Sequence, residues 1–505
     1  MNAAPSGPAT PAAPAPGHRV DALLLAGDDH EHCLTLGRAV DRGSLRALVE
    51  QAGAQLARAG LAEGGTVALR LPPSLALVTG LLAGWRLGAQ VLLLDHRLTR
   101  IEVDRALDRL APQVLVEPAG PAGTALRGYA EVETVAVARP GGRPAEQLSP
   151  GRIHALVQLS SGSTGPSKVV ARTLQDLAAE LDRYSRLPQF PRRGERIVLL
   201  SSLVHVLGLV GGLLWSLHAG VELVLPERLT AAGILAAVTA GPQPTTVIGV
   251  PFYAELLAAA AAPGPLPSFA RMIVAGELVR PGVPEAFTAR YGIPLGTMYG
   301  MTELGVIATD LTGRLRPALD PAHGLDLRVD QGELHIKQPD SPYLGEVDPA
   351  CWSDGWLHTR DAATKDPATG QVVILGRRDS QVSIGGLKVD LTEVERTLSA
   401  VDGVAEAVVV FEAGGIEAYL VLEDGANAAA VREDLALEVA AYKLPRHLRA
   451  LPALPRTATG KLLRDPAALR EAAAAETRAA QARAAAEPAP DARVSVNAGD
   501  VPDLD

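Results

Sequence analysis

The residues best suited to chemistry lie in one short stretch, residues 160–168, which combines hydroxyl groups, two glycines and one lysine. Glycine lets a chain turn without a Cβ clash, so that successive backbone N–H groups can form a concavity that binds an anion. The hydroxyls add donors and the lysine adds a point charge. The stretch therefore predicts a phosphate-binding loop, although a plain surface loop would also fit it taken alone. Its residues are Ser160, Ser161, Gly162, Ser163, Thr164, Gly165, Pro166, Ser167 and Lys168.

Five side chains further along the chain could complete a nucleotide pocket. Tyr299 offers an aromatic face to a base, and Thr302 offers a hydroxyl to a phosphate. Glu303 offers a hard oxygen ligand to Mg²⁺. Asp361 could accept hydrogen bonds from two ribose hydroxyls, and Arg377 could donate to the same sugar. Each of them singly would also fit a structural role, such as a core residue or a helix cap.

The elements that must position these residues alternate between strands and helices. Strands separated by helices of 10–15 residues indicate βαβ units and a parallel, doubly wound sheet. Ligands of such sheets usually lie beyond the carboxyl ends of the strands, and the phosphate-loop stretch follows an apolar, strand-like run. The expected strands are 66–71, 90–94, 114–116, 197–200, 221–225, 246–249 and 271–275, and the expected helices are 37–60, 74–87 and 101–111.

The last third of the chain has a different pattern. Short alternating stretches between residues 325 and 375 predict a small β unit. Beyond residue 376 we expect a small, separate domain, whose first helix has the capping-box spacing of Asp390 and Glu393. The predicted fold class is therefore α/β, with a large N-terminal domain of doubly wound sheets plus a β unit, and a small, mobile α+β C-terminal domain. Its expected elements are helices 391–398 and 428–441 and strands 405–411 and 418–422.

The composition limits the class of protein. A chain of 505 residues is too long for one hydrophobic core, and 47% hydrophobic with 21% charged residues is typical of soluble globular proteins. The net charge of −10 argues against nucleic acid or an anionic membrane as a partner. Two cysteines cannot build a disulfide framework, which favours a cytoplasmic location, and the N-terminus lacks the features of a signal peptide.

One uncharged stretch, residues 197–221, is long enough to span a bilayer. It contains serines, two histidines and four glycines, so we expect a buried strand, loop and helix there instead of a membrane span.

Together and in this order, the motifs resemble those of the adenylate-forming superfamily, which includes acyl- and aryl-CoA synthetases, peptide-synthetase adenylation domains and luciferases. The resemblance covers residues 20–465. It implies a disordered Ala/Pro-rich tail at 1–18, an adenylate-binding domain at 19–376, a hinge at 377–380, a lid domain at 381–466, and a frayed helix with a disordered tail at 467–505. The matching stretches are 160–168 (phosphates), 299–303 (aromatic-Gly-x-Thr-Glu), 359–361 (ribose), 376–395 (hinge and glycine loop) and 455–461 (lysine motif).

The resemblance implies that a substrate carboxylate first attacks the α-phosphorus of ATP and that pyrophosphate leaves. This step depends on positioning and charge neutralisation. Thr164 and Lys168 would hold the β- and γ-phosphates, and Glu303 would hold Mg²⁺. Thr302 would touch the α-phosphate, and Lys461, otherwise an ordinary loop lysine, would bridge the carboxylate and phosphate oxygens. The remaining nucleotide-binding residues would be Ser161, Gly162, Ser163, Gly165, Gly276, Glu277, Tyr299, Gly300, Asp361 and Arg377.

In the second half-reaction that the resemblance implies, the lid swings about Asp379. It brings Gly385 and Gly386 to the site, where two glycines allow close approach to the slim pantetheine arm of CoA. Lys388 would face the nucleotide phosphate or CoA. The CoA sulfur then attacks the acyl-adenylate, and AMP leaves.

One histidine indicates the branch of the superfamily. Amino-acid-activating members keep a carboxylate near the position of His205, whereas residues 202–208 contain none. A histidine there resembles the acyl- and aryl-CoA branch, where it gates the substrate carboxylate, although a core histidine is an equal alternative. The acid pocket is expected around His205, residues 250–253, Gly276 and Met301, which favour an apolar acid. The absence of a carrier-protein domain from the sequence favours CoA as the acceptor.

Three positions depart from the superfamily pattern: Arg360 replaces a glycine, Ser383 replaces a basic or amide residue, and Val169 replaces a glycine. The prediction is an AMP-forming acyl-CoA ligase for an apolar acid, in bacterial specialised metabolism such as antibiotic biosynthesis. The alternatives are an enzyme that only transfers a preformed acyl-adenylate from a separate adenylating enzyme, an acyl-AMP or amide ligase, and a nucleotide-binding pseudoenzyme. The acid and a possible homodimer stay open.

Overall fold

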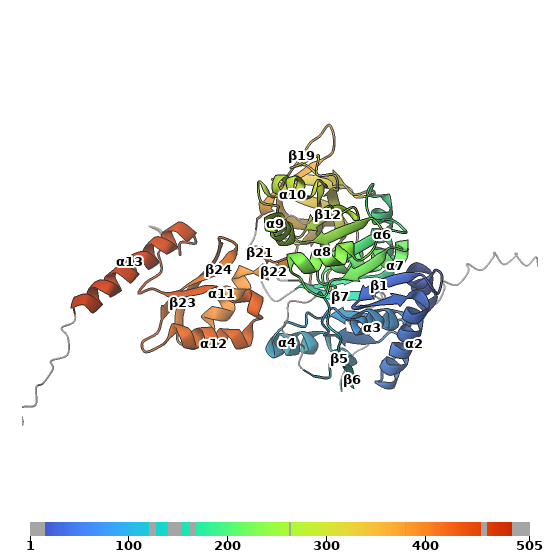
Figure 1. The fold of residues 1–505 in the computed structure, drawn as a ribbon. Helices are drawn as coiled ribbons and strands as arrows, with labels where there is room; N and C mark the ends of the chain where they lie inside the picture. The colour runs from blue at the N-terminus through green and yellow to red at the C-terminus, as the bar shows by residue number, and fades with distance from the viewer. Residues whose placement is uncertain are drawn as a thin grey trace, which may run out of the picture. The chain divides into compact units, whose positions relative to one another are not determined.

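The computed structural model describes residues 16–120, 128–139, 154–160, 168–261, 264–378, 380–455 and 462–486. These residues form two compact units, coloured along the chain in Figure 1. The first runs to Val394 and also includes Ala436–Leu444, and the second comprises Glu395–Leu435 and the chain from Pro445 onward. Residues 381–394, at the start of the predicted lid, group with the first unit. The predicted boundaries of the hinge and the lid stay predictions.

A nine-stranded sheet forms the largest layer of the first unit (Figure 1). Its six central strands are parallel, and antiparallel strands lie at both edges. This arrangement confirms the predicted doubly wound α/β fold. In spatial order the strands are β15 (Asp320–Pro321), β14 (Gly305–Asp310), β13 (Leu295–Met301), β12 (Phe269–Ala275), β11 (Thr245–Gly249), β9 (Arg196–Leu199), β10 (Glu222–Leu225), β1 (His32–Leu36) and β2 (Arg38–Asp41).

A six-stranded sheet forms the second layer, and it is parallel except for one antiparallel strand at each edge. Its last hairpin pairs Ser160 with Lys168, so the predicted phosphate loop connects two strands of this sheet. The order is β6 (Thr134–Ala138), β5 (Val114–Pro118), β3 (Thr66–Leu69), β4 (Gln90–Leu93), β7 (Leu156–Ser160) and β8 (Lys168–Arg172).

Helices bury the apolar faces of both sheets. One cluster joins both sheets to α2 (Arg42–Arg58), α3 (Leu75–Arg86), α6 (Leu174–Arg186) and the π-helix η2 (Leu207–Leu214). Separate clusters cover the opposite faces, on the nine-stranded sheet with α8, α9 and α10 and on the six-stranded sheet with α4. The remaining bounds in these layers are α1 (Pro16–Val20), η1 (Asp21–Leu25), α4 (Arg100–Leu110), α7 (Trp215–Ala219), α8 (Ala231–Thr239), α9 (Pro251–Ala259) and α10 (Val283–Tyr291).

Two of the local expectations have clear outcomes. The predicted helix at 37–60 is wrong at its start, because Arg38–Asp41 pair with β1 before Asp41 caps α2 by accepting from the N–H of Ser44. The uncharged stretch 197–221 folds as β9, a loop, η2 and α7. Within the described chain, no helix combines the length and apolar character that a membrane crossing requires.

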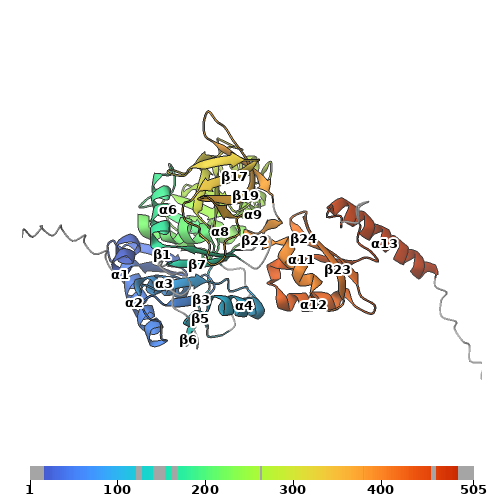
Figure 2. The ribbon, with the colours of Figure 1, turned by 180° about the vertical axis from the view of Figure 1, so that it is seen from behind.

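The small β unit predicted at 325–375 is an antiparallel five-stranded sheet, seen from behind in Figure 2. A two-stranded hairpin follows it. The Asp390 carboxylate then accepts a hydrogen bond from the N–H of Thr392 at 2.8 Å, as a helix cap does. The Glu393 carboxylate accepts a hydrogen bond from the Lys443 ammonium at 3.1 Å. The elements are β16 (Leu327–Asp330), β17 (Glu333–Lys337), β18 (Trp352–Ser353), β19 (Trp356–Lys365), β20 (Val372–Arg377), β21 (Gln381–Ile384), β22 (Leu387–Asp390) and α11 (Leu391–Ser399).

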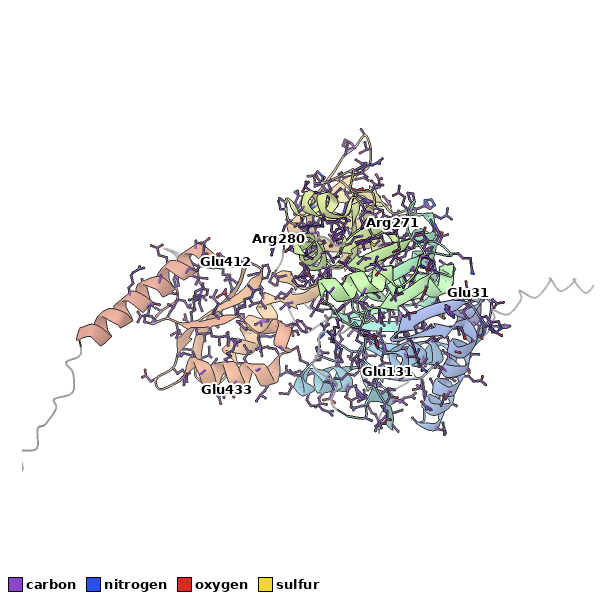
Figure 3. The ribbon with its side chains drawn as sticks, in the orientation of Figure 1. Glu31, Glu131, Arg271, Arg280, Glu412 and Glu433 are labelled. Atoms are coloured by element: carbon purple, nitrogen blue, oxygen red, sulfur yellow. The ribbon has the colours of Figure 1, made fainter. Side chains whose placement is uncertain are left out.

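The second unit has a three-stranded sheet, and its last helix packs on that sheet through Leu469 and Ala473. Glu412, labelled in Figure 3, pairs with Arg470 of this helix at 2.8 Å. The elements are β23 (Val404–Glu412), β24 (Gly415–Leu422), α12 (Ala428–Glu438, continuing into the first unit), β25 (His447–Ala450) and α13 (Pro466–Ala486), while the short 3-10 helix η3 (Ala441–Lys443) belongs to the first unit.

Candidate functional site

Three residues predicted to bind the nucleoside meet in the first unit. The Tyr299 hydroxyl, on β13, donates to Asp361 Oδ2 on β19 at 2.5 Å. Arg377, on β20, donates to Asp361 Oδ1 at 3.3 Å and to the carbonyl oxygen of Thr359 at 2.9 Å. The antiparallel β19–β20 ladder sets Asp361 opposite Arg377. The predicted base and ribose residues therefore form one hydrogen-bonded group.

The Tyr299 hydroxyl acts as a fixed donor in this group. Burial, followed by the charge of Asp361, raises the pKa of Tyr299 well above its ordinary value, so the phenol stays protonated at neutral pH. Its ring packs beside the apolar cluster of the five-stranded sheet. Stacking of this ring on a base stays a prediction.

Glu303 lies in the turn between β13 and β14 and is 8% exposed. Its Oε1 accepts a hydrogen bond from the Tyr343 hydroxyl at 3.0 Å. Burial, followed by the charge of Glu303, raises the pKa of Tyr343, so this hydroxyl remains a donor. Among the described residues, no cation pairs with the Glu303 carboxylate. A carboxylate held on one oxygen and unpaired on the other fits a hard cation such as Mg²⁺.

Lys168, the first residue of β8, stands beside this acid group. Its Nζ lies 2.8 Å from Cys351 Sγ and 5.9 Å from the centre of the Tyr343 ring. Burial raises the pKa of the Cys351 thiol, and the nearby Lys168 offsets part of that rise. No described carboxylate lies within ion-pair distance of Lys168. The ammonium of the last residue of the phosphate-loop stretch is therefore available to an anion.

Helix α6 holds the turn that carries Glu303. Glu180 Oε1 accepts a hydrogen bond from the N–H of Val306 at 3.2 Å, and Arg183 donates to the carbonyl oxygen of Leu304 at 2.6 Å. Glu180 also pairs with Arg172 of β8 at 2.7 Å, and the two side chains are 0% and 2% exposed. This buried pair links the strand that begins with Lys168 to the turn.

Gly300 and Thr302 lie at the end of β13, on either side of Met301. A Cβ on Gly300 would lie 2.5 Å from the carbonyl oxygen of Gly305, so the close approach of the two strands requires glycine here. Thr302 begins the turn. Its contact with an α-phosphate stays a prediction.

His205, the predicted carboxylate gate, faces a buried acid. Its Nε2 lies 3.7 Å from Asp95 Oδ2, and Asp95 also binds Arg97 at 2.5 Å. Burial opposes ionisation of Asp95, but the hydrogen bonds from Arg97 and the charges of Arg97 and His205 outweigh it and hold the pKa of this carboxyl well below its usual range. His205 is thus neither a lone core histidine nor free of partners.

Gly276 and Glu277, which follow β12, contact the glycine hairpin. The N–H of Gly386 donates to Glu277 Oε1 at 2.7 Å, and Lys388 Nζ donates to the carbonyl oxygen of Gly276 at 2.7 Å. Gly385 and Gly386 have φ of +56° and +82°, a conformation that favours glycine. The structure brings these predicted residues together, while their role toward CoA stays a prediction.

Several predicted residues lie outside the described residues. They are the phosphate-loop residues Ser161, Gly162, Ser163, Thr164 and Gly165, the hinge residue Asp379 and the lysine Lys461.

The sequence analysis missed three partners of the predicted residues, Asp95, Tyr343 and Cys351, and it missed Glu180, which holds the turn that carries Glu303. Asp95 follows the strand expected at 90–94, so the rule that ligands meet the carboxyl ends of strands could have found it. The others carry no local signal. Cys351, for example, is 183 residues away from Lys168 in the chain.

One further group, Glu333, His335 and His358 on β17 and β19, has ligand atoms close enough for a metal ion to be considered. The two imidazole rings stack, with centres 4.3 Å apart and planes 28° apart. Ligand lone pairs lie in the ring planes, so stacked rings do not direct them at one point. The arrangement fits a cross-strand stacking pair better than a metal centre.

The chain resembles known proteins over most of its length. Residues 28–347 match the AMP-binding enzyme family, and residues 393–461 match the AMP-binding enzyme C-terminal domain. A p-hydroxybenzoic acid–AMP ligase of Mycobacterium marinum is 28% identical over 84% of this chain and 65% of its own length. A benzoate–CoA ligase of Thauera aromatica is 31% identical over 62% of this chain and 65% of its own length. The chain thus spans less than two thirds of each of these two relatives.

Solved structures share the fold. An o-succinylbenzoate CoA synthetase of Bacillus subtilis superposes with a TM-score of 0.74 at 23% identity, covering 91% of this chain and 98% of the other. An amide bond synthetase of Marinactinospora thermotolerans gives 0.72 at 22% identity, covering 89% and 98%. With the family match extending over more than half of the sequence, the chain belongs to the AMP-binding enzyme family.

Proposed function

We propose that the protein is an AMP-forming ligase that activates an apolar carboxylic acid as an acyl-adenylate and transfers the acyl group to CoA. The observation that carries the proposal is the meeting of Tyr299, Asp361 and Arg377 from three separate stretches of the chain, in contacts of 2.5 and 3.3 Å. A buried carboxylate held by a tyrosine and an arginine is suited to the two hydroxyls of a ribose.

In the first half-reaction, an oxygen of the substrate carboxylate bonds to the α-phosphorus, and the bond to the β-phosphate oxygen breaks. Asp361 orients the nucleoside, and Lys168 neutralises charge on the departing pyrophosphate. Glu303 would hold Mg²⁺, which would supply further charge neutralisation at the phosphates. Lys461 would contribute the cation that bridges the carboxylate and the α-phosphate.

In the second half-reaction, the CoA sulfur bonds to the acyl carbon and the bond to the AMP oxygen breaks. The thiol proton leaves to solvent or to a base. Gly385 and Gly386 would provide the close backbone approach for the pantetheine arm, and the Lys388 ammonium would face the nucleotide phosphate or CoA.

We further propose an aromatic acid as the substrate class. The relatives named above are a p-hydroxybenzoic acid–AMP ligase and a benzoate–CoA ligase. The predicted pocket offers apolar side chains, with His205, whose ring lies 3.7 Å from Asp95, as the polar group that would meet the carboxylate. A cytoplasmic location, a role in specialised metabolism and a homodimer belong to the same proposal.

A second candidate is an acyl-AMP ligase that passes its adenylate to an acceptor other than CoA. The p-hydroxybenzoic acid–AMP ligase, which aligns with 84% of this chain, favours it. The amide bond synthetase fold is compatible with it too.

Mass spectrometry of reaction products tests both. The purified chain is incubated with ATP, Mg²⁺, CoA and a panel of aromatic and aliphatic acids, beside a second set with preformed acyl-adenylates and no ATP. Acyl-CoA in both sets supports the complete ligase. Acyl-AMP alone favours the second candidate, and acyl-CoA from the adenylates alone indicates a transfer-only enzyme. The K461A variant should lose adenylate formation, whereas K337A, at an exposed site, should not. Product in neither set, with no AMP binding, would overturn the proposal.

A further inference from the structure

Arg360 holds an unusual backbone conformation. It lies within β19, yet its φ is +62°, in the left-handed region that favours glycine. The conformation is fixed on both sides, because its N–H donates to Glu333 Oε1 at 3.0 Å and its carbonyl accepts from the N–H of Arg378 at 2.8 Å. A bulky residue kept in such a conformation points to a role for its side chain.

The guanidinium of Arg360 has no partner among the described residues. Its Nε is buried without a hydrogen bond, and no described carboxylate lies within ion-pair distance of it. The neighbouring Arg377 and Arg378, by contrast, both pair with carboxylates. A partly buried cation without a counter-charge is costly, so the site is suited to an anion that comes from outside the chain.

The position of this cation indicates which anion. Arg360 directly precedes Asp361, the predicted ribose residue, and its charge reaches the Cys351 thiol. Burial raises the pKa of that thiol and the Asp348 carboxylate, 3.6 Å from it, adds to the rise, while the charges of Lys168 and Arg360 act against it. Cys351 Sγ in turn lies 2.8 Å from Lys168 Nζ. Two cations without carboxylate partners among the described residues therefore act on one buried thiol, beside the end of the phosphate-loop stretch.

We propose that Arg360 is a phosphate-binding residue whose guanidinium acts together with the Lys168 ammonium on the β- and γ-phosphates of ATP and on the pyrophosphate that leaves. The inference rests on the proposed function and adds a specific ligand group to it. A guanidinium can donate two parallel hydrogen bonds to one phosphate, which an ammonium cannot do.

The test is calorimetric titration of the full chain with inorganic pyrophosphate and Mg²⁺, and separately with AMP. R360N and R360G remove the cation but accept the left-handed backbone, so they should fold and melt at or above the wild-type temperature. R360K restores a cation. R328N is the matched control, because it removes an exposed charge from β16 of the same five-stranded sheet, where the guanidinium lies over the Trp356 ring.

R360N and R360G should weaken pyrophosphate binding at least about tenfold, since one charge-assisted hydrogen bond contributes about a factor of ten to the affinity. AMP binding should change less than about twofold. R360K should recover part of the loss, and R328N should bind like wild type. Wild-type pyrophosphate affinity in R360N, or an equal loss of affinity for pyrophosphate and AMP, would overturn the role assigned to Arg360 and leave the proposed function standing. A wild-type chain that binds neither ligand would overturn the proposed function with it.

Discussion

Replacing Glu180 by alanine tests whether the buried ion pair under the Glu303 turn stabilises the nucleotide site. Glu180 pairs with Arg172 at 2.7 Å, and both side chains are almost fully buried. The same carboxylate accepts the N–H of Val306, at the start of β14. Alanine would leave the Arg172 charge buried without its counter-charge and would remove the acceptor that fixes the strand after the turn.

The magnitude follows from this burial. Breaking a buried ion pair from one side costs about 3–5 kcal/mol, because the remaining charge stays desolvated. For a unit of about 400 residues, with an unfolding entropy of roughly 2.1 cal/mol/K per residue, this corresponds to a fall in melting temperature of about 4–6 °C. Loosening of the turn should also weaken AMP binding.

The assay is a thermal melt of E180A, E180Q and the double variant R172M/E180M, with AMP titrations of each. The matched control is D182A on the same helix, whose pair with Arg186 is solvent-exposed, so its removal should leave the melting temperature close to that of the wild type. The double variant should recover most of the lost stability, since it leaves no unpaired charge. An E180A melt within 1 °C of wild type, or a double variant no better than E180A, would refute the reasoning.

Three further predictions concern the site itself. Y299F should lower the unfolding free energy by about 1.5–3 kcal/mol and raise the Kd for AMP, because the Asp361 carboxylate loses a hydrogen bond; an unchanged AMP Kd by calorimetry would contradict this. D95N should lower the free energy of unfolding by roughly 1–3 kcal/mol at neutral pH. The pKa of Asp95 is lower in the folded state than in the unfolded state. The stability that Asp95 contributes is therefore present above the unfolded pKa of about 3.9 and is lost as pH falls through the folded pKa. The unfolding free energies of the wild type and D95N should accordingly converge at low pH in denaturant melts. A difference in unfolding free energy between the wild type and D95N that does not change with pH would contradict this prediction. G300A places a Cβ 2.5 Å from a backbone oxygen and should cost about 1–3 kcal/mol with reduced AMP binding; wild-type stability in the same melts would show that the strands can separate.

Local pattern accounts for much of the agreement between sequence and fold. Buried parallel strands such as Thr245–Gly249 carry continuous apolar or β-branched runs, which depend on neighbouring residues only. The helix predicted at 37–60 failed at its start for the opposite reason. Arg38–Asp41 become a strand because β1 offers them a pairing partner, and pairing is a tertiary effect.

The sequence by itself determined the family, the order of the motifs and the residue types that a nucleotide site needs, because these are properties of neighbouring residues. Only the tertiary structure decided which side chains meet. Tyr299 and Asp361 are 62 residues apart, and Lys168 and Cys351 are 183 apart, so no local signal relates them. The unpaired state of Arg360 among the described residues is likewise a property of the folded chain, because a counter-charge is present or absent only once distant strands have packed.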